Sequence, residues 1–376
     1  MKRLVLLGGG HAHVHVLSAL AREPMPGVKT VLVTPYARQI YSGMLPGWVA
    51  GHYSLDQCAI PLEPLARAAG AELALAAAVA VDAAQRTVTL SDGRVAEYDA
   101  LSIDTGSVFD RDSIAGARGH AVFVRPIEHF VMLFEEVLKL ASQRVLDIVV
   151  VGGGAAGFEL AMALQHRLCA GGEERARICL VTGDSTVLPN FGDGVRQLAL
   201  QRLKSARVTV VNQRCVEIGP THALLDNGAR LTCDVPLLAL PSVAPPWARD
   251  SGMALDPLGF IATGPTLQNL SQPQVFAAGD VASRSDVALP RSGVYAVRAG
   301  PALALNLRRF LAGGDLQAWK TSPRSLYLLS CGERRAIASW GIWCAQGRWV
   351  WHWKDRIDRR FIERYSGPPP VVTSNA

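Results

Sequence analysis

The sequence lacks the features that mark several large classes of protein. Only 19% of its residues are charged, and no basic stripe accompanies a recognition module, so the net charge of +6 does not indicate a nucleic-acid partner. Its apolar runs are interrupted by Gly, Pro or a charged residue before they reach membrane-spanning length. The apolar segment after Met1-Lys2-Arg3 is about four residues long, too short for the core of a signal peptide. We therefore expect a cytoplasmic protein whose mature chain starts at its first strand.

Cysteine is also sparse and irregularly spaced. The seven cysteines form no C-x-x-C pair and no metal-ligand spacing, and an odd number in a cytosolic protein favours free thiols over a disulfide framework. What the chain does have is length and apolar content: 376 residues, 49% of them hydrophobic, predict a compact protein of two to three domains.

Three tight turns carry most of the functional signal. Two are glycine turns, Gly8-Gly9-Gly10 and Gly152-Gly153-Gly154-Ala155-Ala156-Gly157, and each follows a β-branched apolar run and opens a helical stretch. The third is the acidic turn Phe276-Ala277-Ala278-Gly279-Asp280. A strand, a glycine turn and a helix together bring bare backbone and helix N–H groups to the diphosphate of a dinucleotide. The two glycine turns therefore predict two dinucleotide-binding units.

The remaining pattern repeats around these turns. Each unit reads as strand, turn, helix, strand and then a meander, with the turns Ser91-Asp92-Gly93 and Asp226-Asn227-Gly228 at matching places, which indicates an internal duplication. The expected helices are 12–21, 61–69, one ending at 168, 195–204 and 293–311, and the expected strands include 4–7, 30–33, 98–106, 178–181, 208–211 and 230–240. The predicted fold class is α/β.

With these motifs in this order, the chain resembles the two-dinucleotide-binding-domain flavoproteins of the pyridine nucleotide–disulfide oxidoreductase superfamily. The resemblance implies two Rossmann-type domains, with an FAD-binding domain at 1–110 and 260–320 and an NAD(P)-binding-like domain at 111–259. A small C-terminal α+β cap would occupy 321–376.

The resemblance also implies the residues that hold the nucleotides. In the superfamily the first glycine turn holds the FAD diphosphate and the Ala-Gly-Asp carboxylate binds ribityl hydroxyls, although Asp280 alone could equally be a helix N-cap. The implied FAD contacts are Gly8, Gly10, His11, Ala12, Thr34, Ser42, Gly43, Val79, Thr105, Gly106, Gly279, Asp280, Gly293 and Val294. The implied NAD(P) contacts are Gly152, Gly154, Ala155 and Gly157.

Two segments depart from the nucleotide-binding pattern. An acidic residue for the ribose is expected about 20 residues after each glycine turn. The first unit has Val33-Thr34-Pro35 there, so Thr34 or backbone groups would hold the FAD adenosine, while the second has Thr182-Gly183-Asp184 out of register. The strand expected to end in Ala-Thr-Gly reads Leu238-Ala239-Leu240-Pro241-Ser242. We therefore expect FAD to be bound and treat NAD(P)H as a possible second cofactor.

Three alternating histidines, His11, His13 and His15, allow two interpretations. On a helix His11 and His15 share a face and His13 points elsewhere, so chelation of a metal by all three is geometrically poor. His13 also stands where the third glycine of a dinucleotide fingerprint lets the helix press against the strand. We expect helix-start packing with a phosphate contact, and no metal site.

The closer resemblance is to type II NADH:quinone dehydrogenases and sulfide:quinone reductases, and closer still to the FAD domain that some bacteria carry fused to selenide, water dikinase. The segments that carry it are 11–17, Tyr41-Ser42-Gly43-Met44-Leu45-Pro46-Gly47, 297–301 and 353–361. This implies electron transfer from NAD(P)H through FAD to a quinone or another small acceptor. The alternatives are a sulfur- or selenium-linked flavoprotein, and a flavin-binding regulatory partner with a degenerate nucleotide site. Selenide, water dikinase is a possible partner, and the chain resembles the unfused form.

Glu159 is the catalytic candidate. It matches the glutamate that type II dehydrogenases keep near the nicotinamide, where a carboxyl group could relay the protons that quinone reduction consumes. The alternative is a buried glutamate that local backbone groups satisfy. The segment 36–52, where disulfide reductases carry a C-x₄-C pair, has no cysteine. None of Cys169, Cys331 and Cys344 sits in a sulfide:quinone reductase motif.

The C-terminal segment combines tryptophan with basic residues. Trp349, Trp351 and Trp353 alternate, which predicts one side of a strand. Trp353, Ile357, Phe361 and Tyr365 then recur every four residues, which predicts an amphipathic helix with basic flanks. Such a helix suits a membrane interface, so 350–365 could bind the inner face of the cell membrane. It could equally fold back as a lid over the FAD domain, and we expect a lid that also touches the membrane.

Overall fold

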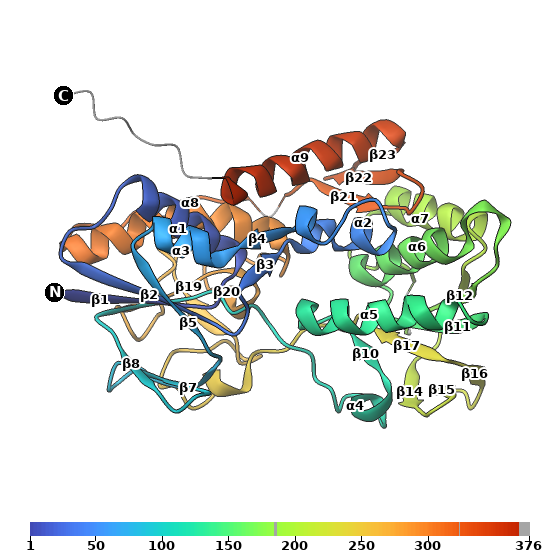
Figure 1. The fold of residues 1–376 in the computed structure, drawn as a ribbon, viewed down its shortest axis with the longest axis horizontal. Coiled ribbons are helices and arrows are strands. Elements are labelled where there is room, and N and C mark those ends of the chain that lie inside the picture. The colour runs from blue at the N-terminus through green and yellow to red at the C-terminus, as the bar shows by residue number, and fades with distance from the viewer. Residues whose placement is uncertain (184–185, 323, 368–376) are drawn as a thin grey trace.

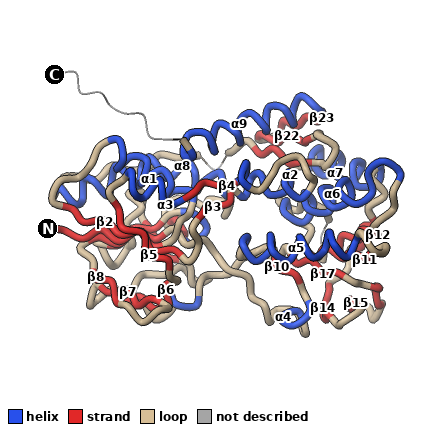
Figure 2. Tube along the Cα trace, in the orientation of Figure 1, coloured by secondary structure: helices blue, strands red, loops and turns tan. Residues whose placement is uncertain are grey.

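The computed structural model describes residues 1–183, 186–322 and 324–367. Two parallel sheets lie side by side, each in its own lobe, and the C-terminal elements run across one side of both lobes (Figures 1 and 2). The predicted α/β class is confirmed. Asp184, which follows Thr182-Gly183 out of register in the second unit, lies outside the described residues.

The first sheet is built from two separate parts of the sequence. All its neighbouring strands are parallel, and β9 carries both β1 and the distant β19 as neighbours. Its strands, in spatial order, are β19 (Val275–Ala277), β9 (Ala100–Ile103), β1 (Lys2–Leu7), β2 (Val28–Thr34) and β5 (Ala71–Leu75). Helices α1 (His11–Arg22), α3 (Leu62–Ala68) and α8 (Gly293–Ala312) pack together beside it.

The second sheet repeats this plan. Its strands are β10 (Val122–Phe123), β17 (Val235–Leu238), β11 (Leu146–Val151), β12 (Ala176–Val181) and β13 (Thr209–Val211). The helices of this lobe are α4 (Ala117–His120), α5 (Ile127–Ala141), α6 (Ala155–Cys169) and α7 (Asp193–Ser205). Strand β11 enters the second glycine turn as β1 enters the first, so the predicted duplication is confirmed in space.

Short antiparallel sheets complete the two lobes. The first lobe carries β6 (Ala78–Asp82), β7 (Thr87–Leu90) and β8 (Val95–Glu97), together with the pair β3 (Arg38–Ile40) and β4 (Ala59–Pro61). The second carries β14 (Cys215–Ile218), β15 (His222–Leu225) and β16 (Arg230–Thr232). Both meanders turn at the predicted Asp-Gly and Asn-Gly positions. The parallel pair β18 (Ile261–Thr263) and β20 (Ala282–Arg284) completes the first lobe. The short helix α2 (Leu45–Val49) packs against α6, and its Leu45 and Val49 belong to the core of the second lobe.

The C-terminal cap is a three-stranded sheet followed by a helix. It comprises β21 (Tyr327–Ser330), β22 (Ala336–Trp340), β23 (Trp343–Gly347) and α9 (Arg348–Ser366). The expectation that Trp349, Trp351 and Trp353 line a strand is therefore wrong, because the helix has already begun at Arg348. Charge pairs one turn apart, Lys354 with Asp358 and Asp355 with Arg359, favour the helix over the strand.

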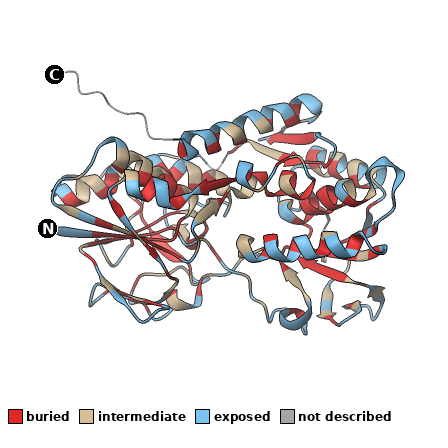
Figure 3. Cartoon of the chain, in the orientation of Figure 1, coloured by how far each residue is buried: buried red, intermediate tan, exposed pale blue. Residues whose placement is uncertain are grey.

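Burial follows these layers. The strands of both sheets are largely buried, whereas α9 is buried on one stripe and exposed on the other (Figure 3). The buried stripe is Val350, Trp351, Lys354, Asp358, Phe361, Ile362 and Tyr365. Across the described residues, no helix is both long enough and apolar enough to span a bilayer.

Candidate functional site

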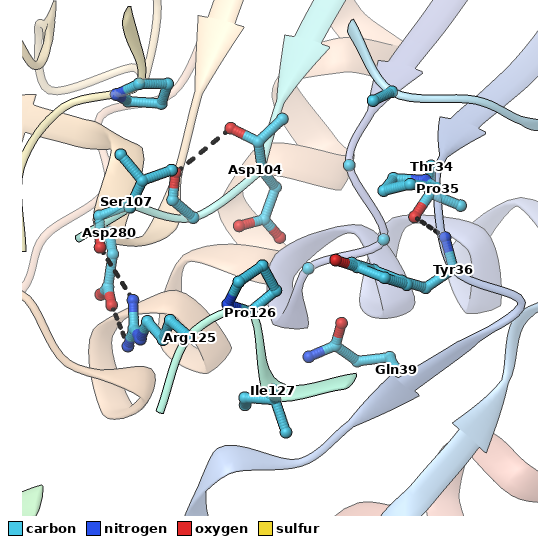
Figure 4. Close-up of a pocket in the computed structure, with 18 of the residues that line it drawn as sticks. Thr34, Pro35, Tyr36, Gln39, Asp104, Ser107, Arg125, Pro126, Ile127 and Asp280 are labelled. Carbon is cyan, nitrogen blue, oxygen red and sulfur yellow. Dashed lines mark hydrogen bonds and ion pairs between the residues drawn. The ribbon is translucent and has the colours of Figure 1, made fainter. Parts of the chain in front are cut away.

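A cavity of about 510 Å³ opens where strands of the first sheet reach their carboxyl ends, the usual ligand position in such sheets. The first glycine turn, the end of β2 and the segment after β9 form its walls, and residues before α5 and the start of α8 close it (Figure 4). Nine of the predicted FAD contacts line it. They are Gly8, Gly10, His11, Thr34, Ser42, Thr105, Gly106, Asp280 and Gly293.

The first glycine turn is shaped by its contact with the end of β9. Gly8 has φ +96°, and a side chain there would collide with the backbone carbonyl of Asp104. A side chain on Gly10 would overlap the Asp104 carboxyl group itself. Glycine at both positions lets the chain run close beside Asp104 before α1 begins.

Asp280 presents one free carboxylate oxygen. Its Oδ2 accepts a hydrogen bond of 2.9 Å from Arg125 Nη2, and Arg125 Nη1 donates to Ser107 Oγ at 2.8 Å. Its Oδ1 is buried, and among the described residues it has no hydrogen-bond partner. Burial of a carboxylate oxygen without a donor is costly, so this atom suits a ligand that brings hydroxyl groups. The acceptor, the glycine cradle and the cavity size together fit the sugar-phosphate chain of FAD.

Arg125 was not predicted from the sequence. It comes from the segment before α5, 155 residues away from Asp280, and no motif connects the two. Figure 4 shows Arg125 reaching Asp280 and Ser107 along one wall of the cavity. Its guanidinium compensates the charge of the carboxylate that faces the ligand.

Asp104 lies in the predicted strand 98–106 but was not predicted as a site residue. Its Oδ2 accepts hydrogen bonds from the N–H groups of Ala12 at 2.7 Å and His13 at 3.0 Å, so it caps α1. Burial, together with a smaller effect of the negative charge of Asp280, raises the pKa of Asp104 to about 8, although the two N–H bonds oppose the shift. The N–H of Ala12, one of the predicted FAD contacts, thus bonds Asp104 in this structure.

The histidines at the start of α1 pack as expected. His13 is fully buried, and its ring bonds the Gly8 carbonyl at 2.6 Å and Ser102 Oγ at 2.8 Å. Burial lowers the pKa values of His11 and His13 to about 4, so both rings are neutral at pH 7. His11 lines the cavity and its Nε2 has no partner among the described residues. Among the described residues, no group of three His, Cys, Asp or Glu side chains could hold a metal ion.

Five predicted FAD contacts lie outside the lining of this cavity. Ala12 is buried, and the Gly43 carbonyl accepts a bond of 2.5 Å from Lys354 Nζ. Val79 lies on β6 with half its surface exposed, and the neighbouring Ala76–Ala78 line the cavity instead. Gly279 lines an adjoining cavity of about 450 Å³ that shares Asp280 with the first, and Val294 lines neither.

The second glycine turn has the backbone of a nucleotide site. Gly152 has φ +131° and lies against the Ala239 carbonyl, while a side chain on Gly157 would collide with the Gly152 carbonyl. Around Gly154 there is open space, at the start of α6. The four predicted NAD(P) contacts thus surround one helix N-terminus, and none of them lines either of the two cavities.

Glu159 lies on α6 but is tied to the cap. Its Oε1 accepts a bond of 2.7 Å from the N–H of Ser330 on β21, which is 171 residues away and not the local backbone partner of the alternative interpretation. Burial raises the pKa of Glu159 to about 7, although the Lys354 ammonium works against the shift. Lys354 itself donates to Asp358 Oδ2 at 2.5 Å. Glu159 lines neither cavity.

All seven cysteines lie in the described part of the chain, and all are free thiols, as expected. None lines either cavity. Burial raises the pKa of Cys58 and Cys331 to about 12, so these thiols are held in their unreactive neutral form.

Comparison with known proteins gives consistent matches. The family model described as pyridine nucleotide-disulphide oxidoreductase matches residues 2–303. An NADH dehydrogenase-like protein of Mycobacterium tuberculosis is 27% identical over 297 residues, covering 75% of this chain and 73% of that protein. A demethylphylloquinone reductase of Synechocystis is 24% identical, with 90% and 86% covered.

Solved structures share the fold. The sulfide:quinone oxidoreductase of Aquifex aeolicus superposes with a TM-score of 0.81 at 18% identity, covering 99% of this chain and 93% of that one. The NDH2 of Plasmodium falciparum, solved in complex with NADH, superposes with a TM-score of 0.75 at 12% identity, with 97% of each chain covered.

Proposed function

The chain belongs to the pyridine nucleotide-disulphide oxidoreductase family, and on that premise we propose that it is an FAD-dependent oxidoreductase resembling type II NADH dehydrogenases. It takes electrons from NAD(P)H and passes them through FAD to a quinone or another small acceptor. We assign FAD binding to the domain of residues 1–110 and 260–320, with Arg125 reaching its cavity from outside that domain. We assign NAD(P)H binding to residues 111–259, and residues 321–376 form the cap.

The unpartnered Oδ1 of Asp280 carries this proposal. It stands in a cavity bounded by the first glycine turn, and it needs donors that the described protein residues do not supply. Ribityl hydroxyls would satisfy it, while the bare backbone of Gly8–Gly10 admits a diphosphate. Arg125 keeps the carboxylate aligned and balances its charge.

The pKa of Glu159 suits a residue that relays protons. Bound FAD supplies the two-electron chemistry, and the chain must supply protons to an acceptor that is reduced to its hydroquinone. With a pKa of about 7, Glu159 holds or releases a proton near neutral pH. Its bond to Ser330 and its proximity to Lys354 fix the carboxyl group where α6 meets the cap.

The arrangement of the cysteines favours NAD(P)H over sulfide as the electron donor. Sulfide chemistry on a flavin needs cysteine sulfurs beside it, whereas in the described chain no cysteine lines either cavity. The regulatory-partner alternative predicts a protein that binds FAD without being reduced by NAD(P)H.

Association with a selenide, water dikinase is proposed from the sequence resemblance alone. Co-purification of the chain with such an enzyme would test it.

We also propose that the cap docks on a lipid surface. Exposed apolar side chains gather at the tip of the β22–β23 hairpin and along the outer stripe of α9. This cap patch consists of Trp340, Ile342, Trp343, Trp349, Trp353 and Ile357. The rings of Trp349 and Trp353 stack with centroids 6.4 Å apart. Exposed arginines on the same helix suit anionic headgroups, and the buried inner stripe makes α9 a lid as well.

Flavin content tests the FAD assignment. We expect the purified chain to carry non-covalent FAD, and Asp280→Ala to lose most of it because the ribityl acceptor and the partner of Arg125 disappear together. Asp250→Ala, at an exposed aspartate, is the matched control and should retain FAD. A wild-type protein that binds no FAD, even after incubation with the cofactor, would refute the proposal.

A further inference from the structure

We propose that Asp104 is part of the FAD site and that it takes part as a neutral carboxylic acid, so that FAD affinity depends on the proton it carries. This inference rests on the proposed function, because it assumes that FAD occupies the cavity at the first glycine turn.

Asp104 occupies the position that a helix N-terminus normally offers to a phosphate. Its Oδ2 accepts from the N–H groups of Ala12 and His13, two of the donors that the start of α1 leaves without helical partners. The positive end of the helix dipole is therefore already partnered by a protein carboxyl group. A diphosphate bound along Gly8–Gly10 lies beside that group and does not replace it.

The internal duplication shows that the fold does not require an acid there. The N–H of Asp104 donates to the Leu7 carbonyl, and the N–H of Ala239 donates to the Val151 carbonyl in the same way. Gly8 packs against the carbonyl of Asp104 just as Gly152 packs against that of Ala239. The equivalent residue of the second unit is thus an alanine, and the carboxyl group is particular to the FAD side.

Two glycines, one in each of two turns, leave room for the carboxyl group of Asp104. A side chain on Gly10 would overlap its Oδ2, and a side chain on Gly279 would stand 2.5 Å from its Oδ1. Two of the three functional turns therefore converge on Asp104. Figure 4 shows its carboxyl group pointing toward the centre of the site, between Asp280 and Arg125 on one side and Thr34 and Tyr36 on the other.

Burial and the negative charge of Asp280 disfavour the ionised form of Asp104, and together they outweigh the two N–H bonds that favour it. Asp280 lies on the turn after β19, and its partner Arg125 is already engaged by Asp280 and Ser107. The rings of His11 and His13 on α1 are neutral at pH 7. Within residues 1–183, 186–322 and 324–367, Asp104 makes no ion pair. Adding a diphosphate brings further negative charge, which a neutral Asp104 tolerates and an ionised one repels.

The proton has one available position. Because Oδ2 accepts two N–H bonds, the acid proton belongs on Oδ1, where it can be donated to an oxygen of the ligand. Burial sets the pKa of Asp104 at about 8 without the ligand, so the group is mostly neutral at pH 7. Above that pH, binding FAD must be accompanied by uptake of a proton.

The test measures the dissociation constant of FAD from the full chain by equilibrium dialysis, from about pH 6 to about pH 10. Wild-type affinity should be constant below about pH 8 and should weaken by up to tenfold for each further pH unit. Asp104→Asn, which keeps the oxygen acceptor and copies the neutral form, should hold the low-pH affinity across the range. Asp250→Asn should behave like the wild type.

Two results would overturn the inference while leaving the proposed function in place: a wild-type affinity that does not weaken above pH 8, or an Asn variant that weakens as the wild type does. A wild type that binds no FAD at any pH would remove the proposed function and the inference together. If Asp104→Asn does not fold, Asp104→Ala, which copies Ala239, gives the same reading. That variant should also bind FAD with no pH dependence, at a lower melting temperature because the cap of α1 is lost.

A second readout needs no FAD. The folded-state pKa of Asp104 lies above its ordinary value of 3.8, so its contribution to stability is complete below that value and is lost as pH rises through about 8. The melting temperature of flavin-free wild-type protein should therefore fall relative to that of Asp104→Asn over this interval. Parallel curves for the two proteins would contradict a neutral Asp104.

Discussion

At the scale of single residues, function depends on a few side chains whose charge is set by burial. Asp280 keeps one carboxylate oxygen open to a ligand, because Arg125 pairs with only the other one. Burial raises the pKa of Glu159 to about 7, so that residue titrates near neutral pH. Both residues were predicted as site residues because each lies in or beside a short sequence motif. Asp280 ends the Ala-Gly-Asp turn, and Glu159 follows the second glycine turn. Asp104 and Arg125 were missed because their roles depend on partners 92 and 155 residues away.

Glu159→Gln gives the clearest prediction at this scale. The variant keeps an acceptor for the Ser330 N–H and removes the titrating group. We expect turnover with a quinone acceptor to fall by about a hundredfold, the lower end of the usual contribution of a positioned acid. The wild type should lose activity as pH rises through about 7, because Glu159 then gives up the proton it must donate, and the variant should lose this break.

The control for Glu159 is Glu135→Gln, an exposed glutamate on α5. Steady-state pH profiles at constant flavin content make the comparison. If Glu159→Gln retains both the turnover and the pH break of the wild type, Glu159 only anchors α6 to the cap through Ser330.

At the scale of elements, α9 shows where sequence patterns conflict. Alternating tryptophans have the period of a strand, while the spacing from Trp353 to Tyr365 has that of a helix. The helix extends over both segments, and its buried stripe is not the predicted four-residue series. Phe361 and Tyr365 face inward, where Phe361 stacks on Tyr41, whereas Trp353 and Ile357 face outward. Sequence predicted an amphipathic helix but could not tell which of its two apolar stripes the lobes would cover.

The outward-facing apolar stripe of α9 should contribute to membrane binding. Trp349 and Trp353 are exposed, so replacing both with serine should leave folding and flavin content intact while weakening binding to vesicles of anionic lipid. Binding should also weaken with salt, since each basic residue near such a surface contributes about 1 kcal/mol. Co-sedimentation with the vesicles measures the effect.

Leu258→Ser is the matched control, because Leu258 is also exposed but lies outside the cap patch. Equal co-sedimentation of the double tryptophan variant and the wild type would leave α9 as a lid alone. Truncation before residue 350 is a poorer experiment, since it also removes the inner stripe that includes Trp351 and Phe361.

At the scale of the whole molecule, the two nucleotide units and the cap meet at one buried charge. Lys354 of α9 donates to the Gly43 carbonyl of the first lobe and to Asp358, and its charge acts on Glu159 of the second lobe. The two lobes were predicted from the duplicated motif, which is local and strong. The cap was predicted as a small α+β segment whose helix forms a lid over the FAD domain. Its packing against the second lobe was not predicted, because the cap has no counterpart in the repeat.

In the proposed function, this molecule moves electrons from NAD(P)H to bound FAD. Anaerobic titration of the purified, FAD-containing protein with NADH and then NADPH tests it most directly, with sulfide as the comparison donor. We expect the visible flavin band to bleach on addition of about one equivalent of NADH or NADPH per FAD, the stoichiometry of a two-electron transfer, and to persist with sulfide. If the protein holds FAD but neither nicotinamide nucleotide bleaches it, the proposed electron transfer does not occur.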